Sequence, residues 1–188
     1  MSPKSSRARG VRRLSKAVSR KARPVSAARP AGGQDAQHMR EAIRLSIQMM
    51  RRGNGGPFGA VVVRNGKIVS RGCNKVTSTN DPTAHAEVVA IREACKRLKT
   101  FQLTDCDLYT SCEPCPMCLS AIYWARFRNV FYANTRKDAA RIDFDDDFIY
   151  REVALPLGKR KLKLKQLLRK EALAAFKEWE QKADKVRY

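Results

Sequence analysis

Two short stretches constrain most strongly what this chain can fold into, because together they match the ligand pattern of one metal site. One holds His85, Ala86 and Glu87 in a row, and the other is a P-C-P-M-C string that carries Cys115 and Cys118. An imidazole and two thiolates fill three positions of a tetrahedral zinc site and leave the fourth open for water. Glu87 lies two residues from the histidine, close enough to exchange protons with that water without binding the metal. The pattern therefore predicts a hydrolytic zinc site.

A closed, structural zinc site is the alternative, and it would need a fourth protein ligand. Cys112 extends the motif to C-x-x-C-x-x-C and could supply a fourth sulfur, whereas His38, the other histidine, lies in a different amphipathic segment. Glu113-Pro114 indicates that a helix begins between Cys112 and the two later cysteines. Those two cysteines then share one helical face beside the positive N-terminal end, which favours thiolates. We therefore expect Cys112 to lie outside the ligand set.

The formal net charge of +21 would normally indicate a nucleic-acid partner, so its distribution along the chain matters. Residues 1–33 carry ten basic and no acidic residues, and residues 158–188 carry eleven basic and four acidic residues. The intervening 34–157 carry eighteen basic and fourteen acidic residues. The excess therefore lies mainly outside the segment with the zinc motifs, and we do not expect a nucleic-acid partner. A basic nucleic-acid-binding protein with a structural zinc site is the alternative from another functional class.

The N-terminal 33 residues are rich in Arg, Ser, Ala and Pro, which predicts a disordered basic extension. An organelle transit peptide, a phosphate-binding arm and an over-long start assignment explain this composition equally well. We expect residues 34–188 to form one catalytic domain. No apolar run approaches the roughly 18 residues that span a bilayer, so no membrane partner is expected. Six cysteines in a chain with a thiolate zinc site indicate a reducing compartment, and we expect a cytoplasmic location.

Hydrophobic periodicity places the first elements of this domain. Apolar residues at three- and four-residue spacing from Ala36 to Met50 predict a helix that ends at the Gly-rich turn 53–57. Two apolar strands at 58–63 and 68–73 flank Asn65-Gly66, a strong hairpin signal. The next elements are expected as a helix that opens at 81–83 and carries His85 and Glu87, a strand at 107–111, a helix from Pro114 to about Ala125, and a strand at 129–133.

This order predicts an α/β fold, a three-layer αβα sandwich, with both zinc-bearing helices on one face of a mixed five-stranded sheet. The fifth strand is expected at 159–166, where lysines alternate with leucines and would protect an exposed edge. A final amphipathic helix is expected from Leu168 to near Tyr188.

Five strings carry a resemblance to a known family: GGPFGAV at 55–61, NDPTAHAEV at 80–88, YTSCEPCPMC at 109–118, AIYWAR at 121–126 and FDDDFIY at 144–150. On these strings, residues from about Gln34 to Tyr188 resemble the cytidine-deaminase-like superfamily, and within it the small bacterial type of guanine deaminase. Relatives that deaminate adenosine in tRNA share the HAE and PCxxC motifs. They typically lack the Phe after the GGP-type turn, the Trp of the cysteine helix and the FDD segment.

The resemblance implies roles for residues around the metal. The motif histidine and cysteines hold Zn²⁺, and Glu87 shuttles protons. Asp146 is a second catalytic residue, which faces the exocyclic amine and assists its departure. The implied substrate-binding residues are Phe58, Asn74, Ala86, Trp124 and Tyr188. Among these, the phenylalanine stacks on the purine, the asparagine hydrogen-bonds it, and the C-terminal tyrosine closes the pocket.

Without the resemblance, structural roles explain several of these residues. Phe58 and Trp124 lie on elements that need apolar side chains, Asn74 could cap a turn, and the acidic run 145–147 could be a solvated loop.

Members of this type are dimers, and exchange of the C-terminal segment between subunits is known among them. The resemblance therefore implies a homodimer in which residues 157–188 are exchanged.

The activity implied by the resemblance is hydrolytic deamination of guanine to xanthine and ammonia, in purine catabolism or salvage. Its partner would be a small-molecule purine substrate. A related aminohydrolase that acts on guanosine, on a triazine such as ammeline, or on adenosine in tRNA is the alternative, because pocket size depends on how the C-terminal segment packs.

Overall fold

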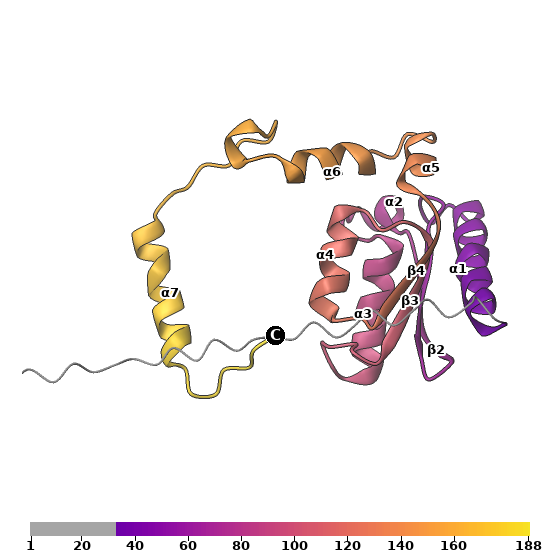
Figure 1. The fold of residues 1–188 in the computed structure, drawn as a ribbon, viewed down its shortest axis with the longest axis horizontal. Helices are drawn as coiled ribbons and strands as arrows, with labels where there is room; N and C mark the ends of the chain where they lie inside the picture. Colours follow the sequence, from indigo (N-terminus) through magenta and orange to yellow (C-terminus); the bar gives the residue numbers. More distant parts are fainter. Residues whose placement is uncertain (1–32) are drawn as a thin grey trace, which may run out of the picture. The chain divides into compact units, whose positions relative to one another are not determined.

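A computed structural model of the chain describes residues 33–188 (Figure 1). Nearly all of the expected N-terminal extension, residues 1–32, lies outside the described residues. The elements are α1 (Gln34–Arg51), β1 (Gly59–Arg64), β2 (Lys67–Cys73), α2 (Val76–Thr79), α3 (Ala86–Leu98), β3 (Cys106–Cys112), α4 (Pro116–Ala125), β4 (Asn129–Asn134), α5 (Arg136–Ala140), α6 (Asp146–Ala154), the 3-10 helix η1 (Leu157–Lys159) and α7 (Arg169–Gln181). In this part of the chain no helix is long and apolar enough to cross a membrane.

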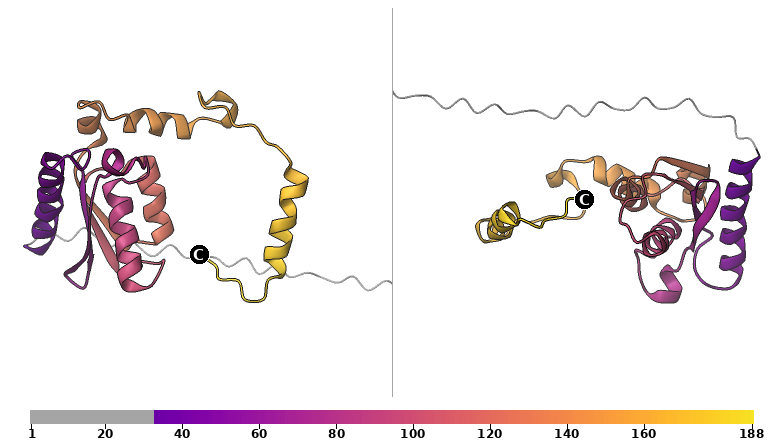
Figure 2. Two further views of the ribbon diagram at one scale, coloured as in Figure 1. Left: turned by 180° about the vertical axis from the view of Figure 1, so that it is seen from behind. Right: turned by 90° about the horizontal axis from the view of Figure 1, so that it is seen from below.

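The four strands form one mixed sheet in the order β2-β1-β3-β4. β1 pairs antiparallel with both β2 and β3, whereas β3 and β4 run parallel. α1 covers one face of the sheet, and α3 and α4 cover the other face (Figures 1 and 2). The three-layer arrangement with a mixed sheet and both zinc-bearing helices on one face is therefore as predicted.

The hairpin between β1 and β2 forms where the sequence predicts it. Asn65 and Gly66 both have positive φ, 50° and 73°, which the tight hairpin turn requires and which these two residue types tolerate best. The strands are paired from Gly59 opposite Cys73 to Arg64 opposite Lys67, with a register shift at Val62 and Val63. The hairpin thus sets the register of β1 and β2, the two strands that α1 and α3 approach most closely.

A hydrophobic cluster between the sheet and α3 and α4 sets the position of the site. Ala90 and Ala94 of α3 lie fully buried against Val62 and Leu108 of the sheet. At Gly72 the helix approaches so closely that an added Cβ would lie 2.1 Å from the carbonyl oxygen of Ala86. Small residues on both sides therefore bring the first turn of α3 directly onto the sheet.

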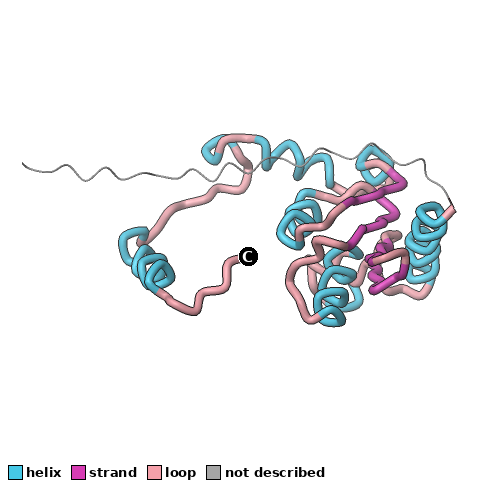
Figure 3. The backbone as a smooth tube through the Cα atoms, turned by 60° about the horizontal axis from the view of Figure 1, so that its bottom comes forward, coloured by secondary structure: helices cyan, strands magenta, loops and turns pink. Residues whose placement is uncertain are grey.

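The sheet has four strands rather than the five that the sequence predicts. Residues 159–166 contain the end of η1 and irregular backbone instead of an edge strand (Figure 3). The leucines of this segment are exposed, with Leu162 at 76% and Leu164 at 57%. An edge strand forms only where it pairs with a neighbouring strand, and in the single chain this segment pairs with none of the described strands.

Helix boundaries differ from the predictions in the second half of the domain. α5 and α6 were not predicted, and α7 ends at Gln181 rather than near Tyr188. α5 begins with a capping box in which Thr135 and Asp138 exchange side-chain and backbone hydrogen bonds, a signal that is legible in the sequence. α6 places the acidic run 145–147 at a helix start, where negative side chains are favourable.

Candidate zinc-dependent active site

The two helices of the zinc motifs begin at the site itself. His85 is the N-cap residue of α3, and Cys115 is the N-cap residue of α4, each with extended backbone. Both helices therefore start later than predicted, at Ala86 and at Pro116. Glu87 and Cys118 lie in the first turns that follow. The site thus collects the positive ends of two helices, which stabilise thiolate and carboxylate groups.

The potential ligand atoms of His85, Cys115 and Cys118 all lie within 4.8 Å of one another. The Sγ of Cys115 lies 3.6 Å from Nδ1 of His85. Tetrahedral bonds of about 2.0–2.1 Å to nitrogen and about 2.3 Å to sulfur would set such atoms about 3.5–3.8 Å apart. The donor set and its spacing therefore fit a zinc ion with three protein ligands.

The electrostatics of the thiols also suit a metal. A hydrogen bond from Cys118, helped by one with His85, lowers the pKa of Cys115 and favours its thiolate form. The same hydrogen bond with Cys115, together with burial, raises the pKa of Cys118. The Cys115 thiolate in turn raises the pKa of His85. The three side chains are thus linked by shared protons when no metal is bound. A divalent cation can replace those protons.

Glu87 is a buried carboxyl group beside the ligands, only 6% exposed. Its Oε1 accepts a hydrogen bond from Thr110 Oγ1 at 3.1 Å, and its Oε2 accepts one from Cys118 Sγ at 3.4 Å. Burial is the main cause that raises the pKa of Glu87. A carboxyl group with a raised pKa, held by the Thr110 hydroxyl beside the possible metal ligands, suits a group that both takes up and delivers a proton.

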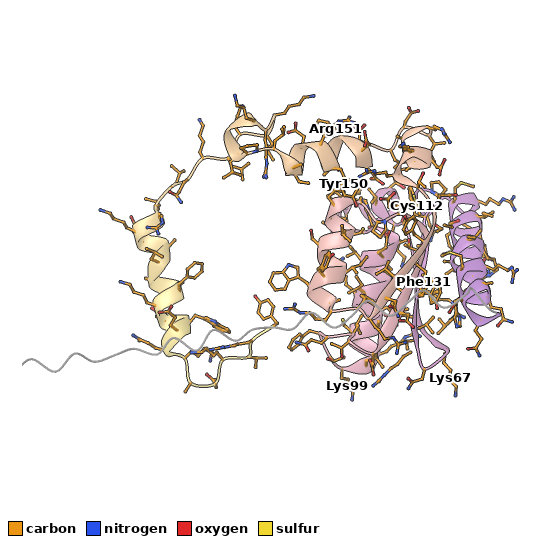
Figure 4. The ribbon with its side chains drawn as sticks, viewed as in Figure 1. Lys67, Lys99, Cys112, Phe131, Tyr150 and Arg151 are labelled. Carbon is orange, nitrogen blue, oxygen red and sulfur yellow. The ribbon has the colours of Figure 1, made fainter. Side chains whose placement is uncertain are left out.

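Cys112 lies near the site but outside the ligand cluster. Figure 4 labels Cys112 near the end of β3. Its thiol donates a long hydrogen bond of 3.6 Å to the carbonyl oxygen of Thr135, and burial raises its pKa to about 12. Its Sγ contacts the backbone of Thr135 and is not part of the cluster of His85, Cys115 and Cys118. Among the described residues the cluster thus has three members, which would leave one of the four tetrahedral positions of a zinc ion for water, the arrangement typical of catalytic rather than structural zinc.

A cavity of about 690 Å³ opens beside the ligands. Its volume is within the range of small-molecule sites. Its lining includes most of the residues singled out in the sequence: Phe58, Asn74, His85, Glu87, Cys115 and Asp146. Residues that are up to 88 positions apart in the chain therefore meet at one cavity.

Asn74 lines this cavity with its oxygen already engaged. Its Oδ1 accepts hydrogen bonds from the backbone N–H groups of Gly56 at 3.2 Å and Val76 at 3.1 Å. Because both neighbours are N–H donors, the side-chain atom that faces them must be the oxygen. The orientation of the Asn74 amide group is therefore fixed. The side-chain nitrogen has no acceptor within the described residues. Gly55 permits this approach, since an added Cβ would lie 2.4 Å from Oδ1.

Phe58 and Asp146 reach the cavity from opposite ends of the domain sequence. The ring of Phe58 packs edge-on against Phe144, with 4.7 Å between the centroids. Asp146 begins α6, and burial, reinforced by the negative charge of Cys115, raises its pKa. The second carboxyl group therefore lies in the same cavity as Glu87 but on a separate element.

Three predicted substrate-binding residues do not line this cavity in the single chain. Ala86 is fully buried at the start of α3. Trp124 of α4 is 60% exposed and contacts Tyr188, with 5.7 Å between the rings. Tyr188 also lies edge-on to Phe101 at 6.4 Å, and both contacts are on the outer side of α3 and α4. The roles of these three residues in substrate binding remain predictions.

The structure adds residues that the sequence did not single out. Thr110 binds Glu87, and Phe144 and Glu113 line the cavity. Thr110 belongs to a buried strand, where polar residues such as Thr110 and Ser111 are a signal that can be read in advance. Phe144 lies within the FDDDFIY string, but only its contact with Phe58 reveals a function.

Comparison with known proteins identifies relatives of the same architecture. The model of the cytidine and deoxycytidylate deaminase zinc-binding region matches residues 33–134. The guanine deaminase of Bacillus subtilis is 53% identical over 150 residues, which cover 80% of this chain and 96% of the relative. Its X-ray structure superposes with a TM-score of 0.79 and 52% identity, and covers 81% of this chain and 98% of that one.

More distant relatives match less of the chain. The tRNA-specific adenosine deaminase of Aquifex aeolicus is 41% identical over 95 residues, 50% of this chain and 62% of the relative. The solved guanine deaminase of Nitrosomonas europaea is 28% identical, with a TM-score of 0.56 over 75% of this chain and 81% of that one. On the family model and on the high identity over nearly the whole Bacillus relative, this chain belongs to the zinc-binding cytidine and deoxycytidylate deaminase family, in its guanine deaminase branch.

Proposed function

We propose that this protein is a zinc-dependent aminohydrolase that converts guanine and water to xanthine and ammonia. The observation that carries the proposal is the buried Glu87 beside the His85, Cys115 and Cys118 cluster, at a cavity large enough for a purine. The high identity to the guanine deaminase of Bacillus subtilis supports guanine among the possible substrates.

The chemistry requires water activation and two proton deliveries. Zinc, when bound to the histidine and the two cysteines, supplies a water whose pKa is lowered toward about 7. Glu87 accepts a proton from the attacking water and delivers it to the ring nitrogen beside C2 of guanine. Addition of the oxygen at C2 gives a tetrahedral carbon, and protonation of the exocyclic amine lets ammonia leave. The carbonyl of xanthine then forms at C2.

Two side chains are suited to hold the base in this reaction. The side-chain oxygen of Asn74 is held by the backbone N–H groups of Gly56 and Val76. Its side-chain NH₂ group therefore offers a donor to the acceptor atoms of guanine. Phe58 offers an aromatic face or edge that is itself held by Phe144. A donor and an aromatic wall orient the base, and such positioning is a large part of catalysis.

Asp146 is proposed to assist the departing amine. Its raised pKa lets it hold a proton close to the site, and its carboxylate can afterwards accept a hydrogen bond from ammonia. In this proposal Glu87 delivers a proton to the ring nitrogen, and Asp146 serves the exocyclic nitrogen.

We further propose a homodimer in which residues 157–188 pack on a partner subunit, with residues 34–188 as the catalytic domain. Large apolar side chains of the C-terminal segment are exposed in the single chain, among them Phe176 at 71% and Tyr188 at 70%. On α4, Tyr123 and Trp124 are 72% and 60% exposed. Exposed aromatic residues in this number are typical of an interface. Light scattering should therefore give about twice the chain mass of 21.3 kDa.

A substrate panel tests the proposed activity. Guanine, guanosine, cytosine, adenine, ammeline and adenosine-containing tRNA would each be incubated with the zinc-loaded protein, and ammonia release would be measured. We expect guanine to give the highest kcat/KM. Preferential turnover of guanosine or ammeline would correct the substrate, and preferential turnover of tRNA would contradict the proposal.

A further inference from the structure

The helix that carries Asp146 has little packing of its own. None of the residues of α6 is buried, although the helix must hold a carboxyl group at the cavity. An exposed short helix is held in place by a few specific contacts rather than by a hydrophobic core. The contacts that α6 makes with the zinc-bearing part of the domain therefore decide where Asp146 lies.

Tyr150 makes the most direct of these contacts. It follows Asp146 by four residues, so both side chains lie on the same face of the helix. Its hydroxyl donates a 2.7 Å hydrogen bond to the carbonyl oxygen of Pro114. Pro114 is buried and immediately precedes the ligand Cys115. Figure 4 shows Tyr150 on α6 where this helix passes α4.

A second set of contacts holds the tyrosine ring. The guanidinium group of Arg136 lies 4.7 Å from the centre of the Tyr150 ring. The backbone N–H of Arg136 donates to Oε2 of Glu113 at 3.0 Å, and the backbone N–H of Glu113 donates to the carbonyl oxygen of Asn134 at 2.8 Å. The end of β4, the start of α5 and the loop before Cys115 are thus joined to one ring.

We propose that Tyr150 is a positioning residue that fixes Asp146 relative to the zinc-binding loop, through its hydrogen bond to the carbonyl of Pro114. This role rests on the proposed function, because it acts through Asp146. In this role the hydrogen bond between Tyr150 and Pro114 determines how far the carboxyl group of Asp146 lies from the metal ligands. The ring and its contact with Arg136 hold the hydroxyl in the required place.

The variant Tyr150→Phe tests this role, since it keeps the ring and removes only the hydroxyl. We expect kcat for guanine to fall by about tenfold or more, while KM changes by less than about threefold. Zinc content and melting temperature should stay close to those of the parent. Tyr132→Phe is the matched control, because Tyr132 is 51% exposed and its hydroxyl has no partner among the described residues.

A double-mutant cycle separates positioning from a general structural effect. In an Asp146→Asn background, Tyr150→Phe should change kcat by less than about twofold, because the group that it positions is already inactive. An equal loss of kcat in both backgrounds would overturn the proposal. Loss of zinc in Tyr150→Phe would also overturn it, since the tyrosine would then serve the metal loop itself.

A measurement without zinc or substrate keeps this inference distinct from the proposed activity. Amide hydrogen exchange of residues 146–154 in the zinc-free protein should be about tenfold faster in Tyr150→Phe than in the parent or in Tyr132→Phe. Unchanged exchange in α6 would overturn the role of Tyr150. A parent protein that leaves guanine intact would instead contradict the proposed function.

Discussion

At the scale of single residues, Glu87 is the proposed proton carrier, and its burial and hydrogen bonds determine how it is held. The carboxyl group has almost no access to solvent, and its two oxygens are bound separately, one by Thr110 and one by Cys118. When Cys118 binds zinc as a thiolate it no longer donates a proton, so the hydroxyl of Thr110 is the donor that still holds Glu87 in the zinc-loaded protein. Thr110 is therefore expected to matter for turnover although it does not line the cavity.

Replacement of Thr110 by Val keeps the shape of the side chain and removes the hydroxyl. A hydrogen bond to a charged group contributes about 1.5–3 kcal/mol, which corresponds to a loss of about tenfold or more in kcat. We expect this loss with zinc content unchanged. Thr110→Ser, which restores a hydroxyl, should recover most of the turnover. Equal activity of the Val and Ser variants would show that the hydrogen bond plays no part.

The grouping of His85, Cys115 and Cys118 could be predicted from the sequence, and the lining of the adjoining cavity only in part. The zinc cluster is readable because each motif is local and lies at the start of one helix. The positions of Asn74 and Asp146 at one cavity came from a family resemblance, since no spacing rule connects residues 72 positions apart. The contact of Phe58 with Phe144 depends on packing between distant segments and is visible only in the structure.

At the scale of elements, α1 and β2 are connected by an ion pair that depends on pH. The carboxyl group of Glu41 on α1 binds Arg44 of the same helix and Arg71 of β2, each at 2.7 Å. The hydrogen bond from Arg44, with a further one from Arg71, lowers the pKa of Glu41 from 4.5 to about 2. A lowered pKa in the folded state stabilises the fold above the unfolded value of about 4.5, and this contribution is lost as pH falls toward 2.

Glu41→Gln should therefore lower the melting temperature near pH 7 and make little difference near pH 2. Melting curves of the parent and the variant between these limits measure the effect. Loss of zinc in acid affects both proteins alike, so the difference between them isolates Glu41. A difference that stayed constant, or grew, as the pH fell would contradict this assignment.

The elements themselves were predictable where their signals are local. The hairpin at Asn65-Gly66 and the helix from Gln34 follow from turn chemistry and periodicity. The prediction of a fifth strand at 159–166 was wrong because alternating lysines and leucines do not by themselves provide a neighbouring strand to pair with. α6 was missed because its acidic start is also typical of a solvated loop, and its position depends on contacts with the loop before Cys115.

At the scale of the whole molecule, the C-terminal segment stands out among the described residues because the single chain leaves its apolar side chains exposed. α7 has no buried residue, and Tyr188 contacts Trp124 outside the cavity. An amphipathic helix gains most of its stability from a surface against its apolar face. In the proposed dimer a partner subunit provides that surface and brings Tyr188 to the neighbouring site.

Mixing two impaired variants tests this exchange. Deletion of Tyr188 alone should reduce guanine turnover while leaving zinc content and thermal stability close to the parent. When this variant is mixed with Glu87→Gln, one site in each mixed dimer has both groups, and some activity should return. If subunit exchange is verified and the mixture stays inactive, Tyr188 does not cross between subunits.

The central claim is that Glu87 beside a three-ligand zinc site drives the deamination of guanine. The most direct test measures xanthine and ammonia formed from guanine, and zinc bound, on the same samples of the parent and Glu87→Gln. We expect the parent to form the two products in equal amounts, and the variant to keep its zinc but lose about 10²–10⁴ in rate. A parent that forms no xanthine, or a variant whose turnover is within about threefold of the parent, would contradict the account.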